Sequence, residues 1–316
     1  METPTIRPSR PEDDAHIVAT VNALNPDWPP LTVQALRFGR GLQPEDANLG
    51  SFVAIHCDRV IGDVLWVRVT HVPEQRAYWC TIRVHPSCWG KGAGSALYAH
   101  MLSQVGADGA NLLYAGYRED HTTARHFLQR RDFLPTGYIN RQARLTVCEA
   151  RLEMAQKANL RLCGEGVRVA TLAELGPRDE TLLRSAHRLD EEASADVPSS
   201  EKWSSKSFEE WRRQILDDPA SGPSLCWLAL EGDRVVGLAQ LLRRGSENGF
   251  TAVGRGYRGR GIAQALKFHQ IEWAQRHGVA FIITGNDAAN GPMVKVNEAL
   301  GYRPLPAVIE MVKELT

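Results

Sequence analysis

The chain has 316 residues, 43% of them hydrophobic, and its 37 basic and 37 acidic residues cancel to a net charge of zero. Domains usually contain about 100–200 residues, so a chain of this length is expected to form two cores. A neutral chain carries no global field that would draw it to nucleic acid or an anionic membrane, so any anion site must be local.

The six cysteines are scattered and form no CxxC pair, which is typical of reduced thiols rather than of disulfides or a zinc site. The N-terminal residues METPTIRPSRPEDD lack an apolar signal region, and no eighteen uncharged apolar residues run together. We therefore expect a cytoplasmic protein with no membrane partner and no metal.

The first part of the chain predicts strands interrupted by helices. Ser9 and Glu12 have capping-box spacing ahead of a helix through Ile17. Strands are expected, in order, at residues 5–7, 52–55, 60–69, 78–84 and 143–147. Between the last two strands lies HPSCWGKGAGSALYAHM, a glycine loop that runs into a helix.

The second part of the chain repeats this plan. Residues 52–62 match residues 227–237 with a shift of 175 (227 − 52). Later positions match with a shift of 169 (253 − 84), which pairs Val84 with Val253, Gly90 with Gly259, Gly92 with Gly261, Leu97 with Leu266 and Phe133 with Tyr302. Chance would not hold one register over fifty positions, so the pattern indicates an internal duplication.

The duplication predicts two similar domains, and the mix of antiparallel hairpins with later strand–helix units predicts that each is of mixed α/β (α+β) class, a mostly antiparallel sheet flanked by helices. We place the first at residues 1–147, a connecting helix at 148–166 and the second at 167–316. In the second domain we expect a helix after Pro177, an irregular acidic segment, a helix begun by Ser207 and Glu210, strands at 225–230, 235–242, 280–284 and 308–312, and a helix at 292–300.

The segment FTAVGRGYRGRGIAQALK, residues 250–267, reads as strand, tight loop and helix. Gly259 and Gly261 allow positive φ or close ligand approach, so N–H groups at the helix start can face one concavity. A phosphate is favoured there by the helix N-terminus and by Arg258 and Arg260. A solvated turn or an RGG-like nucleic-acid segment is the alternative interpretation of the same residues.

Both halves resemble the GNAT superfamily of N-acyltransferases. The superfamily carries [RQ]-x-x-G-x-[GA] in the loop that binds the pyrophosphate of acetyl-CoA, and residues 258–263, RGRGIA, match it in full. Downstream, TGNDAANGPMVKVNEALGY at 284–302 resembles the superfamily's fifth strand and fourth helix. The resemblance implies a sheet that splays between its fourth and fifth strands, with the acyl-pantetheine arm in the gap.

The resemblance assigns the cofactor site mainly to the second domain. Val253 and Gly254 would pair with the pantetheine arm. The pyrophosphate loop would comprise Arg258, Gly259, Arg260, Gly261, Ile262 and Ala263. Asn290 would lie near the cofactor, or would be an ordinary N-cap before Pro292.

The first domain is less faithful to the motif. Its loop could form a possible second cofactor site made of Val84, Gly90, Lys91, Gly92, Ala93 and Gly94. Trp89 stands where Arg258 stands, which removes a donor, and His121 stands at the place of Asn290. We therefore expect a degenerate domain that supports the second one, with His121 and His126 on a helix surface.

The implied reaction is direct attack of an amine on the thioester. A lysine-like ammonium needs roughly 4.6 kcal/mol to reach its free base at pH 7, so a base is required. Glu247 and Asp287 are the candidates, and each has the alternative of a solvated turn carboxylate. The superfamily's helix-four tyrosine is replaced by Asn297, which can donate a hydrogen bond to the leaving sulfur but no proton.

In the superfamily the segment between the first two helices lines the acceptor site, here residues 187–203. Asp196 is the preferred acceptor contact, and a solvated acidic face is the alternative. The sequence therefore predicts an acetyl-CoA-dependent N-acyltransferase that acts on a small-molecule amine, as a monomer or homodimer, without nucleic acid. A non-catalytic acyl-CoA sensor is the alternative.

Overall fold

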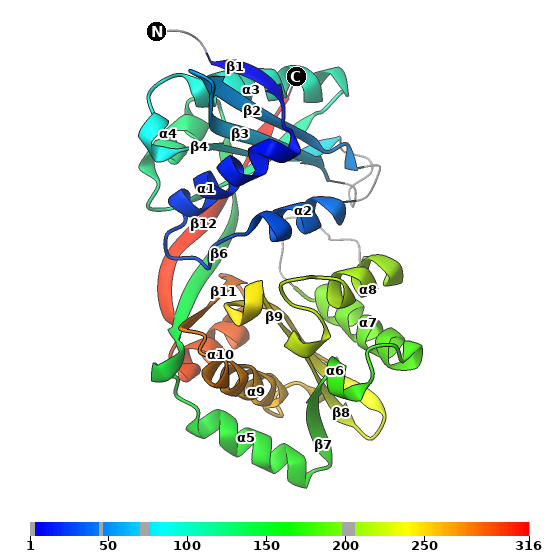
Figure 1. The fold of residues 1–316 in the computed structure, drawn as a ribbon. Helices are drawn as coiled ribbons and strands as arrows, with labels where there is room; N and C mark the ends of the chain where they lie inside the picture. Colours follow the sequence, from blue (N-terminus) through cyan, green and yellow to red (C-terminus); the bar gives the residue numbers. More distant parts are fainter. Residues whose placement is uncertain (1–3, 44–46, 70–75, 198–205, 316) are drawn as a thin grey trace. The chain divides into compact units, whose positions relative to one another are not determined.

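The computed structural model describes residues 4–43, 47–69, 76–197 and 206–315. The chain forms two compact units. Unit 1 comprises residues 1–138 and 308–316, and unit 2 comprises residues 139–307. Each unit is a twisted mixed sheet with helices packed on it (Figure 1).

The sheet of unit 1 has the order β1-β2-β3-β4-β5-β12. These strands are β1 (Thr5–Pro8), β2 (Gly50–His56), β3 (Arg59–Arg68), β4 (Ala77–Val84), β5 (Leu112–Arg118) and the end of β12 (Arg303–Glu314). Its helices are α1 (Asp14–Leu24), α2 (Val33–Gly41), α3 (Ala93–Ala107) and α4 (Thr122–Gln129). Neighbouring strands run antiparallel except β4 and β5, which are parallel.

The sheet of unit 2 has the order β6-β11-β10-β9-β8-β7. These strands are β6 (Leu134–Thr146), β7 (Val167–Thr171), β8 (Cys226–Glu231), β9 (Arg234–Leu242), β10 (Glu247–Val253) and β11 (Phe281–Asp287). Its helices are α5 (Glu153–Gly164), α6 (Leu172–Leu175), α7 (Glu180–Ser194), α8 (Phe208–Leu216), α9 (Ile262–Arg276) and α10 (Gly291–Leu300). Here β10 and β11 are the parallel pair.

The core of each unit lies between the sheet and the helix that follows its glycine loop. In unit 1, Leu97 and Met101 are one turn apart on α3 and pack beside Tyr78 and Cys80, alternate residues of β4. In unit 2, α9 covers one face of the sheet, and α7 and α8 cover the other. The two faces explain why the β8 strand, CWLALE, is buried almost throughout.

The unit boundaries differ from the predicted ones because two strands cross them. Residues 140–146 of β6 were assigned to the first domain, yet they pair with β11 of unit 2. Residues 308–314 of β12 were assigned to the second domain, yet they pair with β5 of unit 1. Each unit thus completes its sheet with a strand segment from the other half of the chain.

The segment predicted as a connecting helix is indeed helical, as α5, but it is no linker. Its residues Ala155 and Leu162 are buried in the core of unit 2 and pack with α9. The boundary of unit 2 at residue 139 therefore includes α5 in the fold.

Two local predictions were wrong. Ser9 and Glu12 form no capping box, because Asp13 accepts from the Arg10 N–H (2.7 Å) and pairs with Arg7 instead. The acidic segment expected to be irregular is helical up to Ser194, as part of α7. By contrast, Ser207 and Glu210 form the predicted capping box of α8.

Candidate functional site

Each unit opens its sheet at the parallel strand pair. In unit 1 the pairing of β4 with β5 ends at Trp79 and Tyr114. In unit 2, β10 pairs with β11 only at Glu247 and Ile283. Beyond Trp79, β4 has a strand partner only in β3, so every second N–H and C=O of residues 80–84 points into the gap.

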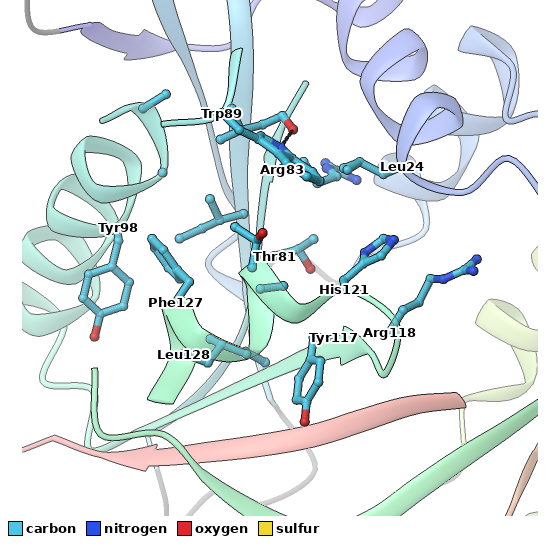
Figure 2. A pocket seen from close by; sticks show the side chains of 18 of the residues that line it. Leu24, Thr81, Arg83, Trp89, Tyr98, Tyr117, Arg118, His121, Phe127 and Leu128 are labelled. Atoms are coloured by element: carbon cyan, nitrogen blue, oxygen red, sulfur yellow. Dashed lines mark hydrogen bonds between the residues drawn. The ribbon is translucent and has the colours of Figure 1, made fainter. Parts of the chain in front are cut away.

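The gap in unit 1 is a cavity of about 670 Å³, within the usual range for a small-molecule site. One side is lined by apolar groups that include Tyr98, Phe127 and Leu128 (Figure 2). The other side presents Leu24, Arg83, Arg118 and His121, from α1, β4, β5 and the start of α4. The cavity is therefore apolar toward α3 and polar toward α1.

The glycine loop closes one end of this cavity. Gly90 and Gly92 have φ of 77° and 80°, and nothing lies within 4 Å of the place where a Cβ would stand on either. No side chain caps the N-terminus of α3, which begins at Ala93. A helix N-terminus that is open in this way favours an anion, and the exposed Lys91 adds a positive charge.

Trp89 and Arg258, which stand at equivalent positions, both bond the loop to the end of the preceding strand. Its indole N–H donates to the carbonyl of Val84 at 2.8 Å. At the equivalent position of unit 2, Nε of Arg258 donates to the carbonyl of Val253 at 3.2 Å. The loss of the arginine in unit 1 therefore leaves the loop anchored to the end of its strand.

The polar side of the cavity is organised by ion pairs. Arg83 donates from Nε and Nη2 to the buried Asp63. Arg118 donates to Asp27 (3.0 Å) and to Asp120 (2.9 Å), and hydrogen bonding to Arg118 lowers the pKa of Asp120. His121 lies with Nε2 3.9 Å from Asp120 and lines the cavity.

Cys80 also lines the cavity, but it is no nucleophile. Burial raises the pKa of its thiol to about 12, so the reactive thiolate is scarce at neutral pH. On the α1 side His121 lines the cavity, and its imidazole is a group that can take up a proton from an acceptor.

The arginines of the unit 2 loop already have carboxylate partners. Asp196 pairs with Arg255 (2.7 Å) and Arg258 (2.6 Å), and hydrogen bonds from these two arginines lower the pKa of Asp196. Arg260 pairs with Glu165 (3.0 Å) and Glu231 (3.3 Å). Asp196, predicted as an acceptor contact, thus binds Arg258, one of the two predicted phosphate arginines. The rest of that acceptor segment, 198–203, lies outside the described residues.

Helix α5 also covers the start of α9. A Cβ on Gly261 would stand 3.1 Å from Cβ of Ala158 and 3.2 Å from Nη2 of Arg161. Arg161 donates to the carbonyl of Arg260. Gly259, Ile262 and Ala263 keep the predicted strand, loop and helix arrangement, and nothing lies within 4 Å of the place where a Cβ would stand on Gly259. At Gly261, by contrast, neighbouring side chains cover the loop.

The predicted catalytic residues of unit 2 have structural partners. Glu247 pairs with Arg243 at 2.6 Å, and burial raises the pKa of its carboxyl group. Asp287 accepts from the Ala289 N–H at 2.5 Å, which closes a turn. Asn297 is buried and donates to Asn286 at 2.8 Å.

The two remaining predicted residues also serve the fold. Asn290 is the N-cap of α10 and accepts from the Met293 N–H at 3.4 Å. The Gly254 N–H donates to the Val236 carbonyl at 3.1 Å, so it is not available to a pantetheine amide. His121 was placed on a helix surface by its sequence context, and only the fold shows it at the cavity wall. Its shift of 169 from Asn290 was the one signal in the sequence.

Comparisons with known proteins agree with this geometry. The family model described as Acetyltransferase (GNAT) family matches residues 17–133 and again residues 186–302, two ranges separated by the same 169 positions (186 − 17). A search of curated proteins finds no match. In the described part of the chain, no helix is both long and apolar enough to cross a bilayer, and no cluster of side chains is arranged to hold a metal ion.

Solved structures share the fold along the whole chain. A GCN5-related N-acetyltransferase from Sphaerobacter thermophilus is 19% identical, with a TM-score of 0.69 over 98% of this chain and 95% of that one. A tandem GNAT protein from the clavulanic acid biosynthesis pathway is 18% identical, with a TM-score of 0.73 over 98% of both chains. A fungal glucosamine N-acetyltransferase region is 15% identical, with a TM-score of 0.70 over 98% of this chain and 38% of that one.

The fold and the repeated strand, glycine loop and helix define a tandem acyltransferase. The chain belongs to the acetyltransferase (GNAT) family, with one family domain in each half.

Proposed function

We propose that the chain transfers the acetyl group of acetyl-CoA to the amine of a small molecule, and that unit 1 is the unit that binds acetyl-CoA. The observation that carries this proposal is the cavity of about 670 Å³ between β4 and β5, bounded by an unobstructed glycine loop. This proposal reverses the expectation that unit 1 is degenerate.

The residues of unit 1 suit a diphosphate attached to an extended arm. Gly90 and Gly92 leave room for phosphate oxygens, and the first N–H groups of α3 face them. The cavity-facing backbone of β4 offers amide partners to the arm. Acetyl-CoA supplies an activated thioester. With the diphosphate at the glycine loop and the arm along β4, the acyl carbon lies farther from the loop, inside the cavity.

The acceptor enters from the α1 side, where the polar groups lie. His121 accepts the proton that the ammonium must lose, a loss that costs about 4.6 kcal/mol for a lysine-like amine at pH 7. Asp120, at 3.9 Å from the ring, stabilises the positive charge that then forms on His121. The amine nitrogen forms a bond to the acyl carbon as the C–S bond breaks, and the CoA thiolate leaves and takes up a proton from solvent. The chain itself contributes removal of the amine's proton and positioning of the amine.

The test is turnover of acetyl-CoA with a panel of small amines, followed as free thiol and as N-acetylated product. We expect one thiol for each product molecule with at least one class of amine. Tight binding of acetyl-CoA without thiol release by any amine would instead favour a binding protein without catalysis.

A further inference from the structure

Unit 2 buries polar side chains at positions where unit 1 buries mostly apolar ones. At the shift of 169 the pairs are Tyr98 and Lys267, Met101 and Gln270, Leu128 and Asn297, and Phe133 and Tyr302. All eight side chains are buried. In unit 1 these positions form the core and the apolar side of the cavity, so the same part of unit 2 has a different chemistry.

Lys267 is the centre of this polar group. It is only 2% exposed, and its Nζ lies 5.6 Å from the centre of the Tyr302 ring. Burial lowers the pKa of its amine to about 7, and no carboxylate contributes to that shift. An ammonium at this place therefore lacks a counter-ion within the part of the chain that the structure describes.

Three buried polar atoms of residues around Lys267 have no hydrogen-bond partner among the described residues. Asn248 donates from Nδ2 to the Tyr302 hydroxyl at 2.6 Å, which leaves its Oδ1 buried and unpaired. Gln270 lies three residues after Lys267, on the same face of α9, and is 0% exposed. Among the described residues neither amide atom of Gln270 has a partner.

Buried polar atoms are almost always hydrogen-bonded, and each exception calls for a partner such as water, an ion or a ligand. Here one face of α9 and the facing β10 bring together an ammonium, an unpaired amide donor and two unpaired amide oxygens. Unit 1 has a more apolar core at the same positions, where Tyr98 alone of the four carries a polar atom, and it therefore buries fewer groups of this kind.

We propose that Lys267, Gln270, Asn248 and Tyr302, here called the polar cluster, bind a small carboxylate that also carries a hydroxyl or amino group. The carboxylate accepts from the Lys267 ammonium and from Nε2 of Gln270. The hydroxyl or amino group donates to Oδ1 of Asn248 or Oε1 of Gln270. Such a ligand balances the charge of Lys267 and pairs Nε2 of Gln270 and one of the two amide oxygens, and an amino group, which has more than one N–H, can pair both oxygens.

The polar cluster lies beside the place where the parallel strands of unit 2 separate. β10 and β11 pair only at Glu247 and Ile283, and Asn248 follows directly on β10. This inference does not depend on which amine unit 1 acetylates.

The test uses the full chain and two probes, glycolate and glycine, with acetate and sodium chloride at equal ionic strength for comparison. We expect glycolate or glycine to raise Tm in a saturable way, acetate to act more weakly, and chloride to have no effect. Calorimetric titration of the same probe into the wild-type protein gives a second readout that needs no variant.

Lys267→Met and Gln270→Met remove the proposed contacts, and the latter copies Met101 of unit 1. Both should lose the probe-dependent rise in Tm while keeping acetyl-CoA binding, and Lys295→Met, a change at an exposed lysine of α10, should behave as the wild type. Absence of binding by both probes, or an equal rise in Tm in both cluster variants, would show that the cluster holds only water.

Discussion

At the scale of single residues, His121 is the clearest addition that the fold makes to the site. It lines the cavity beside Arg118, while His126, one turn along α4, is exposed and does not line it. The same helix therefore offers a catalytic candidate and a matched control.

We predict that His121→Ala lowers kcat by about 10²–10⁴-fold, the usual loss for a general base, and that His126→Ala leaves it unchanged. The measurement is thiol release under saturating acetyl-CoA, over a pH range. The His121 variant should recover activity as pH rises and the amine loses its proton to solvent. Equal rates for the two variants would remove His121 from the mechanism.

Lys267 gives a prediction on stability. Its pKa is about 7 in the folded chain against 10.5 in the unfolded chain, so the unfolded chain binds more protons between these values. The free energy of unfolding should therefore rise with pH from about 7, with up to roughly 5 kcal/mol regained by pH 10.5. Burial raises the pKa of Cys80 and Cys226 to about 12, and these thiols oppose the trend above about pH 9.

The measurement is urea unfolding of the wild type and of Lys267→Met at pH 7.0, 7.8 and 8.5. The free energy of unfolding should be higher for the variant than for the wild type at pH 7.0, and this difference should shrink as pH rises. A difference that stays constant with pH would mean that the lysine keeps its ordinary pKa in the folded chain.

At the scale of elements, the strand, glycine loop and helix could be predicted twice from the sequence, because glycine spacing and hydrophobic periodicity are local signals. The partners of Arg258 and Gly261 could not, because Asp196 and Arg161 are far away in the chain. The sequence therefore identified both loops and favoured the second because that loop matches the motif in full. It carried no information on the carboxylates that pair with the arginines of the second loop.

The end of β12 gives the prediction at this scale. Met311 is 2% exposed in the core of unit 1, whereas Met154 on α5 is 65% exposed. Met311→Ala should lower the free energy of unfolding by about 2–5 kcal/mol, because it removes a buried side chain and leaves a cavity. Met154→Ala should change it by less than about 0.5 kcal/mol. Equal effects in urea unfolding would contradict the assignment of residues 308–314 to unit 1.

At the scale of the whole molecule, the sequence predicted the duplication but not the exchange of strands between the two units. A constant shift of 169 indicates that the two halves have the same order of strands and helices, and the family matches at 17–133 and 186–302 confirm the repeat. Periodicity predicts strands at residues 143–147 and 308–312, but it carries no information on which sheet each one joins. The order of strands had to come from the fold.

The central claim, that unit 1 holds acetyl-CoA, is tested most directly by one matched pair of variants. Ser95 on α3 and Gln264 on α9 are 169 positions apart, each at the third position of its helix. A glutamate there suits the helix but repels a diphosphate, by about 3 kcal/mol at 5 Å and an effective dielectric constant of 20. In calorimetric titration with acetyl-CoA we predict that Ser95→Glu weakens binding at least tenfold and Gln264→Glu leaves it unchanged. The reverse result would place the cofactor in unit 2 and contradict the account.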